Sequence, residues 1–352
     1  MGEANRVNFY GLSLLELEEY LLRHDFKKFH AGQIFEWVYQ KRMIDPEHMT
    51  NLSKCLRTFL NDTFSFSLLE IQTIHESEDQ TKKFLFKLED GHLIESVLMR
   101  HDYGNSVCVT SQVGCNMGCA FCASGLAKKV RNLSLEELVG QVVAIGTNEQ
   151  IRVSHVVVMG TGEPFDNYDA IVRFIALINH DKGLAIGQRH ITVSTAGIVP
   201  KIIAYANEPI RSNLAISLHA PNDQLRTRLM PINKSYPIRK ILEATDYYFS
   251  QTSRRVTFEY VLLKGVNDQK EHIDQLAKLM KGRNAYVNVI PYNRVNEFAF
   301  LPTDNAQAMI FVDGLMKQGI QATLRKKQGS DIAAACGQLR RRLTSKNPDD
   351  CD

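Results

Sequence analysis

The residues most suited to chemistry in this chain are cysteines, because four of its seven lie between Cys108 and Cys122. Three of them, Cys115, Cys119 and Cys122, follow the spacing CxxxCxxC on one short segment. Three thiolates this close together can hold a soft metal centre, and iron–sulfur clusters are held by such ligands. A structural zinc site usually has four protein ligands, and the fourth is missing here. The spacing therefore favours a [4Fe–4S] cluster with one open iron over a zinc site or three incidental cysteines.

The composition indicates where such thiols would work. The chain of 352 residues has no apolar run as long as a membrane span, and its start, MGEANRVNF, lacks the layout of a signal peptide. We therefore expect a cytoplasmic monomer with no membrane partner, in a reducing compartment where clustered cysteines bind metal or react. The net charge of +3 is too small to establish nucleic-acid binding by itself. Each of the basic runs at 128–131, 325–327 and 340–342 fits a solvated face.

From about residue 105 onward, extended runs alternate with helical ones. This alternation predicts βαβ units and an α/β fold with a parallel sheet, closed or partly closed into a (β/α) barrel. The strands are expected near 106–112, 155–159, 190–194, 213–217, 255–262, 286–290 and 320–325, and helices near 133–145, 167–178, 238–250 and 270–280.

Polar residues follow the ends of these predicted strands. Reactive groups gather at the carboxyl edge of parallel sheets, so we expect these residues to lie near the three cysteines. From the residues alone, the serine and histidine side chains could equally satisfy backbone groups, and Cys108 and Cys336 could be packing cysteines. The residues in question are Gly162, Glu163, Ser194, Ser217, Leu218, His219 and Asn293, with Cys336 following the last strand.

The first third of the chain has a different pattern. Ser13 and Glu16 form a capping box, and helices are also expected at 31–41 and 51–60. Two extended runs around Asp90-Gly91 predict a β-hairpin over 83–100. The expected organisation is a helical accessory domain (1–75), a hairpin extension (76–100), the partial barrel with the Cys336 loop (101–343) and a polar tail (344–352).

Two residues in this first third of the chain, Cys55 and Glu95, could each be structural or functional. Cys55 lies in the third helical pattern and is expected to be a small buried hydrophobe. Glu95 shares a face of the second hairpin strand with Leu93 and Val97. A carboxylate among apolar neighbours is suited to proton transfer, whereas an exposed strand glutamate would only face water.

The cysteine segment, with Phe121 before its last cysteine, resembles the radical S-adenosylmethionine (SAM) superfamily. The segment Met159 to Pro164 looks like the glycine-rich stretch with which that superfamily meets the methionine amino group. Longer stretches, VCVTSQVGC, ITVSTAGIVPKI, NLAISLHAPND and DIAAACGQL, are similar to the RlmN/Cfr family of RNA adenine methyltransferases. The resemblance covers nearly the whole chain, and the helical start looks like that family's RNA-contacting domain.

The resemblance implies one [4Fe–4S] cluster on Cys115, Cys119 and Cys122 and two SAM molecules per turnover. It implies that Cys336 carries the methyl group, that Cys108 is the resolving cysteine and that Glu95 accepts a proton. The implied SAM contacts are Gly162, Glu163, Ser194, Ser217, Leu218, His219 and Asn293.

The implied reaction methylates adenine C2 in the peptidyl transferase region of 23S rRNA and in tRNA next to the anticodon. Adenine C2 has no nucleophilic lone pair, which favours a radical route. A 5′-deoxyadenosyl radical would act on S-methylated Cys336 to form a protein–RNA adduct, which Cys108 resolves as a disulfide. A reductase system such as flavodoxin would donate electrons. The alternatives are a Cfr-type C8 methyltransferase and a metal-stabilised RNA-binding module without catalysis. Family members commonly have Asp where this chain has Ala333, so any role of that acid in ordering the Cys336 loop is absent here.

Overall fold

The computed structural model describes residues 6–339 of the chain. The basic run at 340–342, the expected polar tail at 344–352 and Cys351 lie outside the described residues.

One ten-stranded sheet organises the described chain, in the order β14-β13-β12-β11-β10-β9-β6-β5-β4-β3. The strands β6 and β9 to β14 are parallel, whereas β5, β4 and β3 continue the sheet antiparallel beyond β6. The strand bounds are β3 Glu70–Glu76, β4 Lys82–Lys87, β5 Leu93–His101, β6 Gly104–Cys108, β9 Val153–Val158, β10 Ile191–Thr195, β11 Asn213–Ser217, β12 Val256–Leu262, β13 Ala285–Pro291 and β14 Ala322–Leu324.

Two further pairs of short strands lie outside this sheet. Strands β1 (Val7–Asn8) and β2 (Phe64–Ser65) pair in parallel, and β7 (Gln112–Val113) and β8 (Arg131–Asn132) pair antiparallel. The second pair closes the base of the segment that carries the three clustered cysteines.

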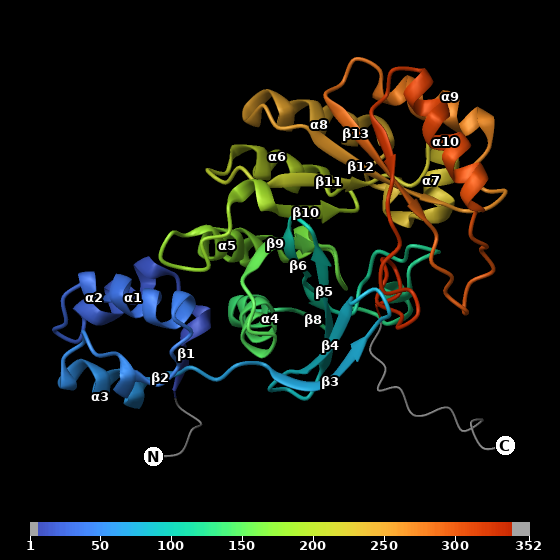
Figure 1. Ribbon diagram of the computed structural model, residues 1–352. Coiled ribbons are helices and arrows are strands. Elements are labelled where there is room, and N and C mark those ends of the chain that lie inside the picture. The colour runs from blue at the N-terminus through green and yellow to red at the C-terminus, as the bar shows by residue number, and fades with distance from the viewer. Residues whose placement is uncertain (1–5, 340–352) are drawn as a thin grey trace, which may run out of the picture.

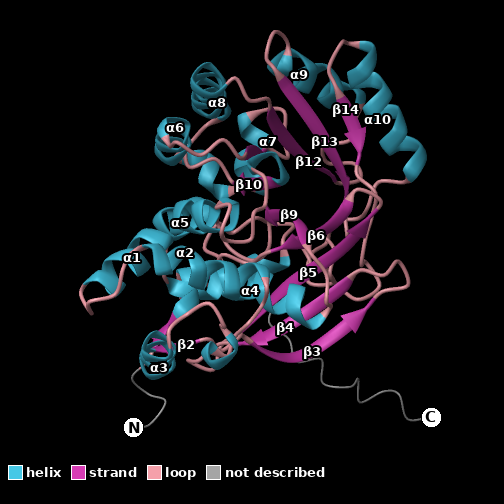
Figure 2. Cartoon of the chain, turned by 60° about the vertical axis from the view of Figure 1, so that its left-hand side comes forward, coloured by secondary structure: helices cyan, strands magenta, loops and turns pink. Residues whose placement is uncertain are grey.

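The sheet curves without closing, because within residues 6–339 its edge strands β14 and β3 do not pair with each other. Helices cover one face of the parallel strands (Figures 1 and 2). This is the partial parallel barrel that the sequence predicts, and the 83–100 hairpin is also confirmed, as β4 and β5. The hairpin extends the barrel sheet directly, and β3 pairs with β4 as its outermost strand.

The helices predicted from the sequence are all present, as α1, α2, α3, α4, α5, α8 and α9. Three helices were not predicted, α6, α7 and α10. No helix within residues 6–339 has both the length and the apolar character needed to cross a bilayer. The bounds are α1 Leu14–Leu22, α2 Phe29–Phe35 continuing as a π-helical turn Glu36–Gln40, α3 Lys54–Thr63, α4 Leu135–Asn148, α5 Tyr168–Asn179, α6 Val199–Asn207, α7 Asp223–Leu229, α8 Ile238–Thr252, α9 Lys270–Met280 and α10 Asn305–Lys317.

The parallel strands alternate between apolar and polar residues. Val193 and Ile216 point into the main core beneath the helices, whereas Thr192 and Asn288 line a cavity on the other side of the sheet. Parallel strands buried on both faces are usually apolar throughout. The alternation here arises because the inner face of the sheet lines a cavity and is not packed against a second layer of helices.

The N-terminal helices pack around a group of aromatic residues that is continuous with the main core, and an ion pair also joins them to the barrel. Phe9 packs against Phe35 and Tyr39, with ring centroids 5.6 and 6.0 Å apart. The Arg173 guanidinium on α5 lies 2.7 Å from the Glu16 carboxylate of the α1 capping box. The capping residue that starts α1 therefore also helps to anchor the accessory helices.

The expectation that Cys55 is buried is wrong. Helix α3 buries Leu56 and Leu60, four residues apart on one face, and Cys55 is exposed. A residue one position before the buried stripe is turned by about 100° around the helix axis, toward solvent.

A buried glutamine joins the hairpin to the barrel. The Gln141 Oε1 on α4 accepts hydrogen bonds from Ser96 Oγ on β5 at 2.7 Å and from the Thr110 backbone N–H at 2.8 Å. Its Nε2 donates to the Thr110 carbonyl at 3.0 Å. Because buried amides must be satisfied, these bonds fix β5 relative to the segment that follows β6.

Candidate active site at the carboxyl edge of the sheet

The three clustered cysteines lie on the loop between β7 and β8 and line one cavity together. The loop is held by its backbone: the Cys115 N–H donates to the Ala127 carbonyl at 3.1 Å and the Cys122 N–H to the Cys119 carbonyl at 3.2 Å. Gly114 has φ +83°, and a Cβ there would lie 2.2 Å from the Lys128 carbonyl oxygen. A side chain at this turn would force the loop open.

Burial raises the pKa of each clustered thiol, to about 11 for Cys115. The three sulfurs are not gathered at metal-ligand distances, since no group of three or more His, Cys, Asp or Glu within the described part of the chain forms a metal-binding set. The donor chemistry nevertheless fits a soft iron–sulfur centre, because the cavity wall offers three thiols and metal binding displaces their protons.

Two glycines shape the same cavity. A Cβ on Gly160 would lie 2.7 Å from the Val109 carbonyl oxygen and from Thr110 Oγ1. A Cβ on Gly162, which has φ +110°, would lie 2.6 Å from Ser111 Oγ. The glycine-rich segment thus lies directly against the segment after β6, and larger residues would push it into the cavity.

Glu163 places a carboxylate at the cavity wall. Its Oε2 accepts the Ala196 N–H at 2.6 Å and its Oε1 accepts the Phe165 N–H at 3.0 Å. Burial raises the pKa of Glu163 to about 7, although these hydrogen bonds oppose the shift. A buried carboxylate oriented in this way suits a ligand ammonium group, which would also keep the carboxyl ionised.

His219 lies at the end of β11 with φ +57°, a conformation that few non-glycine residues adopt. Its Nδ1 lies 3.1 Å from the Val261 N–H, and burial lowers the pKa of His219 to about 3. The ring is therefore neutral, Nδ1 accepts the backbone hydrogen, and Nε2 carries the proton. Ser194 and Ser217 line the same cavity, with their hydroxyl oxygens 3.4 Å apart.

Leu218 does not share this cavity. Its side chain is fully buried in the main core, and only its backbone lies at the strand end. There its N–H donates to the Glu259 carbonyl at 3.1 Å and its carbonyl accepts Arg226 Nε at 3.2 Å.

Arg226 is a residue that the sequence reasoning missed. It is 0% exposed and donates five hydrogen bonds, three of them to the carbonyls of Ala196, Ser217 and Leu218. The guanidinium thus holds together the ends of β10 and β11, where the cavity-lining residues stand. Nothing in the sequence DQLRTRL marks this arginine, because basic residues on a short helix are usually exposed.

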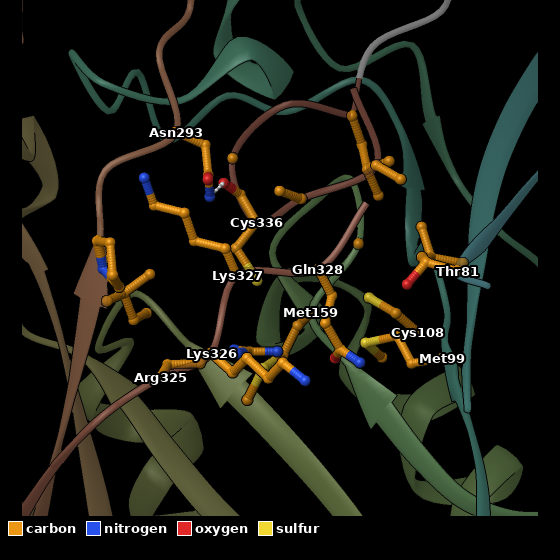
Figure 3. A pocket seen from close by; sticks show the side chains of 18 of the residues that line it. Thr81, Met99, Cys108, Met159, Asn293, Arg325, Lys326, Lys327, Gln328 and Cys336 are labelled. Atoms are coloured by element: carbon orange, nitrogen blue, oxygen red, sulfur yellow. Dashed lines mark hydrogen bonds between the residues drawn. The ribbon is translucent and has the colours of Figure 1, made fainter. Parts of the chain in front are cut away.

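A second cavity adjoins the first and contains the other two cysteines (Figure 3). Cys108 and Cys336 are free thiols on opposite walls of this cavity. Burial, and then the nearby Cys336 thiol, raise the pKa of Cys108 to about 12. Cys336 and Cys122 line both cavities, so Cys336 stands at their boundary. Asn293 Nδ2 donates to the Cys336 carbonyl at 3.3 Å.

Basic residues also line this second cavity. Lys326 and Lys327 are exposed, as expected for a solvated run, yet they line the thiol cavity with Arg325. By contrast, two residues of the run at 128–131 pair with acids: Lys129 with Asp166 and Arg131 with Glu137, each at 2.7 Å.

Glu95 lies behind the wall of the second cavity. It is 4% exposed, not an exposed strand residue, and its Oε1 is 3.2 Å from Lys83 Nζ. Cys108 on β6 is opposite Val97 on β5, which is opposite Lys83 on β4. Glu95 precedes Val97 by two residues, so all four side chains share one face of the sheet.

The loop that carries Cys336 is tied to the β3–β4 turn. Asp331 Oδ1 accepts Ser77 Oγ at 2.5 Å, and Asp79 Oδ2 accepts the Gly329 N–H at 3.0 Å. Ala333 has φ +51°. Asp and Asn adopt this left-handed conformation more readily than Ala does, so the backbone at Ala333 is strained.

Comparisons with known proteins agree with this geometry. The family model described as "Radical SAM superfamily" matches residues 109–279, and "Ribosomal RNA large subunit methyltransferase N-terminal domain" matches residues 7–65. A crystal structure of a radical SAM methyltransferase from Sphaerobacter thermophilus has a TM-score of 0.90 and 42% identity, covering 95% of this chain and 99% of that one. The fold and the cysteine cavity thus define a radical SAM methyltransferase.

Curated relatives narrow the class. A probable dual-specificity RNA methyltransferase RlmN from Geobacillus thermodenitrificans is 55% identical over 346 residues, which are 96% of this chain and 95% of the relative. The protein of the same name from Listeria welshimeri is 52% identical over 343 residues, 95% of this chain and 94% of the relative. The chain belongs to the RlmN family.

Proposed function

We propose that the protein methylates C2 of adenine in RNA, in the peptidyl transferase region of 23S rRNA and beside the anticodon of tRNA. One observation carries the proposal: Cys336 lines both cavities. On one side it faces the wall with the three clustered cysteines and Glu163, and on the other the cavity of Cys108. A cysteine at this boundary can take a methyl group from one cavity and deliver it in the other.

The first step suits the first cavity. We assign the cluster to Cys115, Cys119 and Cys122, and the SAM contacts to Gly162, Glu163, Ser194, Ser217, His219 and the backbone of Leu218. Asn293, which lines the adjoining second cavity, would reach SAM from that side. The Cys336 thiolate attacks the sulfonium methyl: a carbon–sulfur bond to Cys336 forms, the sulfonium bond breaks, and a neutral thioether leaves. A cluster held by these three cysteines would supply the one-electron chemistry of the reaction: an electron for the reductive cleavage of a second SAM, and an acceptor for the electron that leaves the adduct.

The remaining steps suit the second cavity. The S-methyl carbon of Cys336, after losing a hydrogen atom, bonds to adenine C2 and joins protein to RNA. Glu95 then accepts the C2 proton. The Cys108 thiolate attacks the Cys336 sulfur, a disulfide forms, and the carbon–sulfur electron pair takes up a proton to give the product methyl. A thiol reductant restores both cysteines for the next turnover.

Further parts of the proposal concern partners. Residues 7–65 match a model named for a ribosomal RNA methyltransferase, which supports a role for the accessory helices in RNA contact. We propose that the protein works as a cytoplasmic monomer and receives electrons from a reductase system such as flavodoxin. The exposed Lys326 and Lys327 at the thiol cavity are placed to attract the RNA backbone.

Anaerobic reconstitution followed by RNA methylation tests the proposal. Nucleoside digestion and mass spectrometry should give 2-methyladenosine; 8-methyladenosine would favour the Cfr-type alternative. The Cys108→Ala variant should trap an RNA adduct on Cys336. The control variant Cys55→Ala removes an exposed cysteine on α3, outside both cavities, and should methylate RNA at the normal rate. A colourless zinc protein without methylated Cys336 would support the non-catalytic alternative instead.

A further inference from the structure

We propose that Lys83 is a positioning residue that holds both Glu95 and the Cys336 loop for the release of the protein–RNA adduct. This inference rests on the function proposed above. It assigns a role to a lysine on β4 for which the sequence pattern predicts only a place in the hairpin.

The first observation is burial. Lys83 is 8% exposed and Glu95 is 4% exposed, and their Nζ and Oε1 atoms are 3.2 Å apart. Lysine is almost never buried without a partner, because removing the ammonium from water costs several kcal/mol per ion. A hydrophobic residue of similar size would often serve stability equally well at such a position. The ion pair therefore calls for a role other than stability.

The second observation is the other contact of the same ammonium. Lys83 Nζ donates to the Ala333 carbonyl at 3.5 Å, a long hydrogen bond. Ala333 precedes Cys336 by three residues and has φ +51°. One ammonium thus contacts both the proposed base and the loop that carries the methyl-bearing sulfur.

The third observation is register. Lys83, Val97 and Cys108 are directly opposite one another on three adjacent strands. Neighbouring strands are about 4.8 Å apart, so Lys83 lies two strand spacings from the resolving cysteine on the same face. Lys82, the preceding residue, points to the other face and pairs with Glu149 at 2.9 Å. Of these two neighbouring lysines, Lys83 is the one on the face that carries Cys108.

These contacts indicate what Lys83 does in adduct release. The C2 proton moves to a Glu95 oxygen while the electron pair of the C–H bond stays in the ring, so the carboxyl must be ionised and correctly aimed. The Lys83 ammonium lies 3.2 Å from Glu95 Oε1 and limits the rotation of that carboxylate. Its hydrogen bond to the Ala333 carbonyl holds the Cys336 loop in position relative to Glu95. Lys83 acts through Glu95 and the Ala333 carbonyl, without a proposed contact to the adenine or to either sulfur.

The test compares Lys83→Met with Lys82→Met in the full-length, cluster-loaded protein. A misplacement of about 1 Å can cost about 100-fold in rate, so we expect Lys83→Met to slow adduct release by about 10- to 100-fold. The KM for RNA should change less than twofold, and the RNA adduct should accumulate as a shifted gel band. Lys83→Arg should restore most of the release rate, and Lys82→Met should behave as the unmodified protein.

A second measurement does not depend on turnover. Hydrogen exchange of the peptide spanning 329–337 should be faster in Lys83→Met than in Lys82→Met. Lys83→Gln, which keeps a donor for both oxygens, replaces Lys83→Met if that variant does not fold, with the same direction expected. Normal release in Lys83→Met, or equal losses in both lysine variants, would overturn the inference. If the unmodified protein forms no methyladenosine at all, the proposed function fails instead.

Discussion

Replacing Arg226 by Met should destabilise the protein more than most single substitutions would. The guanidinium is 0% exposed and donates to the carbonyls of Leu218, Tyr236, Ala196 and Ser217 at 3.2, 3.3, 2.7 and 3.1 Å. Its fifth bond is to Asn233 Oδ1 at 3.0 Å. Met fills much of the volume but provides no donor, so these oxygens would lose a partner.

The magnitude follows from two opposing effects. Hydrogen bonds to a charged group contribute about 1.5 kcal/mol each at the low end, so the five bonds contribute roughly 7 kcal/mol. Against this, burial lowers the pKa of Arg226 from 12.5 to about 10, which corresponds to roughly 3 kcal/mol of desolvation. The difference predicts that Arg226→Met lowers the free energy of unfolding by about 4 kcal/mol.

Urea unfolding of the full chain, followed by circular dichroism, measures this loss. Arg228 lies on the same helix α7 and is exposed, so Arg228→Met is the matched control, with a change within about 0.5 kcal/mol. SAM affinity should also fall in Arg226→Met, because the guanidinium sets the spacing of Ala196 and Ser217. A loss below about 1 kcal/mol, or equal losses in the two variants, would refute the reasoning.

Two further predictions concern the cavity walls. Burial lowers the pKa of His219 to about 3 from 6.5, so the unfolded chain binds more protons below pH 6.5, and the stability from neutral His219 is lost as the pH falls from 6.5 toward 3. At pH 5 the loss is about 2 kcal/mol, and urea unfolding at pH 7 and 5 should show it as the difference in pH dependence between the unmodified protein and His219→Asn, because buried Glu163 shifts the stability of both in the opposite direction; parallel pH dependence in both would contradict the assignment. Gly160→Ala should lower stability by about 2 kcal/mol and weaken SAM binding, because its Cβ would meet backbone 2.7 Å away, whereas Gly146→Ala, with its nearest contact at 3.4 Å, should not. Thermal unfolding with and without SAM distinguishes the two glycine variants. Equal melting temperatures in both would show that the backbone around Gly160 can move to accommodate a Cβ.

Much of the fold could be predicted because the sequence pattern is local. Each predicted barrel strand is an extended run, two of which end at Ser194 and Ser217, and the structure has a strand at every one of these runs. The missed helices α6, α7 and α10 have weaker local signals. Helix α6 starts with Val199-Pro200, and α7 has only seven residues, so its position depends on tertiary contacts such as those of Arg226.

The residue types of the candidate site could be predicted from the sequence, but the burial of its residues and their pairing could not. Strand ends placed Ser217 and His219 at one edge, yet nothing local could show that Glu95 is buried with Lys83, because that pairing joins two strands through their register. The same limit explains Cys55. A helical pattern indicates that a buried stripe exists, but a shift of one residue decides whether a cysteine lies on it.

The position of Cys336 at two cavities follows from the strand order. Strand β6 pairs in parallel with β9 on one side and antiparallel with β5 on the other, so it joins the barrel to the hairpin. The barrel side supplies the cavity of the clustered cysteines, and the hairpin side supplies Glu95 and Lys83. The chain after β14 has to cross this junction, where Asp331 fastens it to Ser77. Removing the Asp331–Ser77 hydrogen bond should therefore slow delivery of the methyl group to RNA more than methyl loading on Cys336. Only delivery requires Cys336 to meet Cys108 on β6 and Glu95 on β5 at the same time.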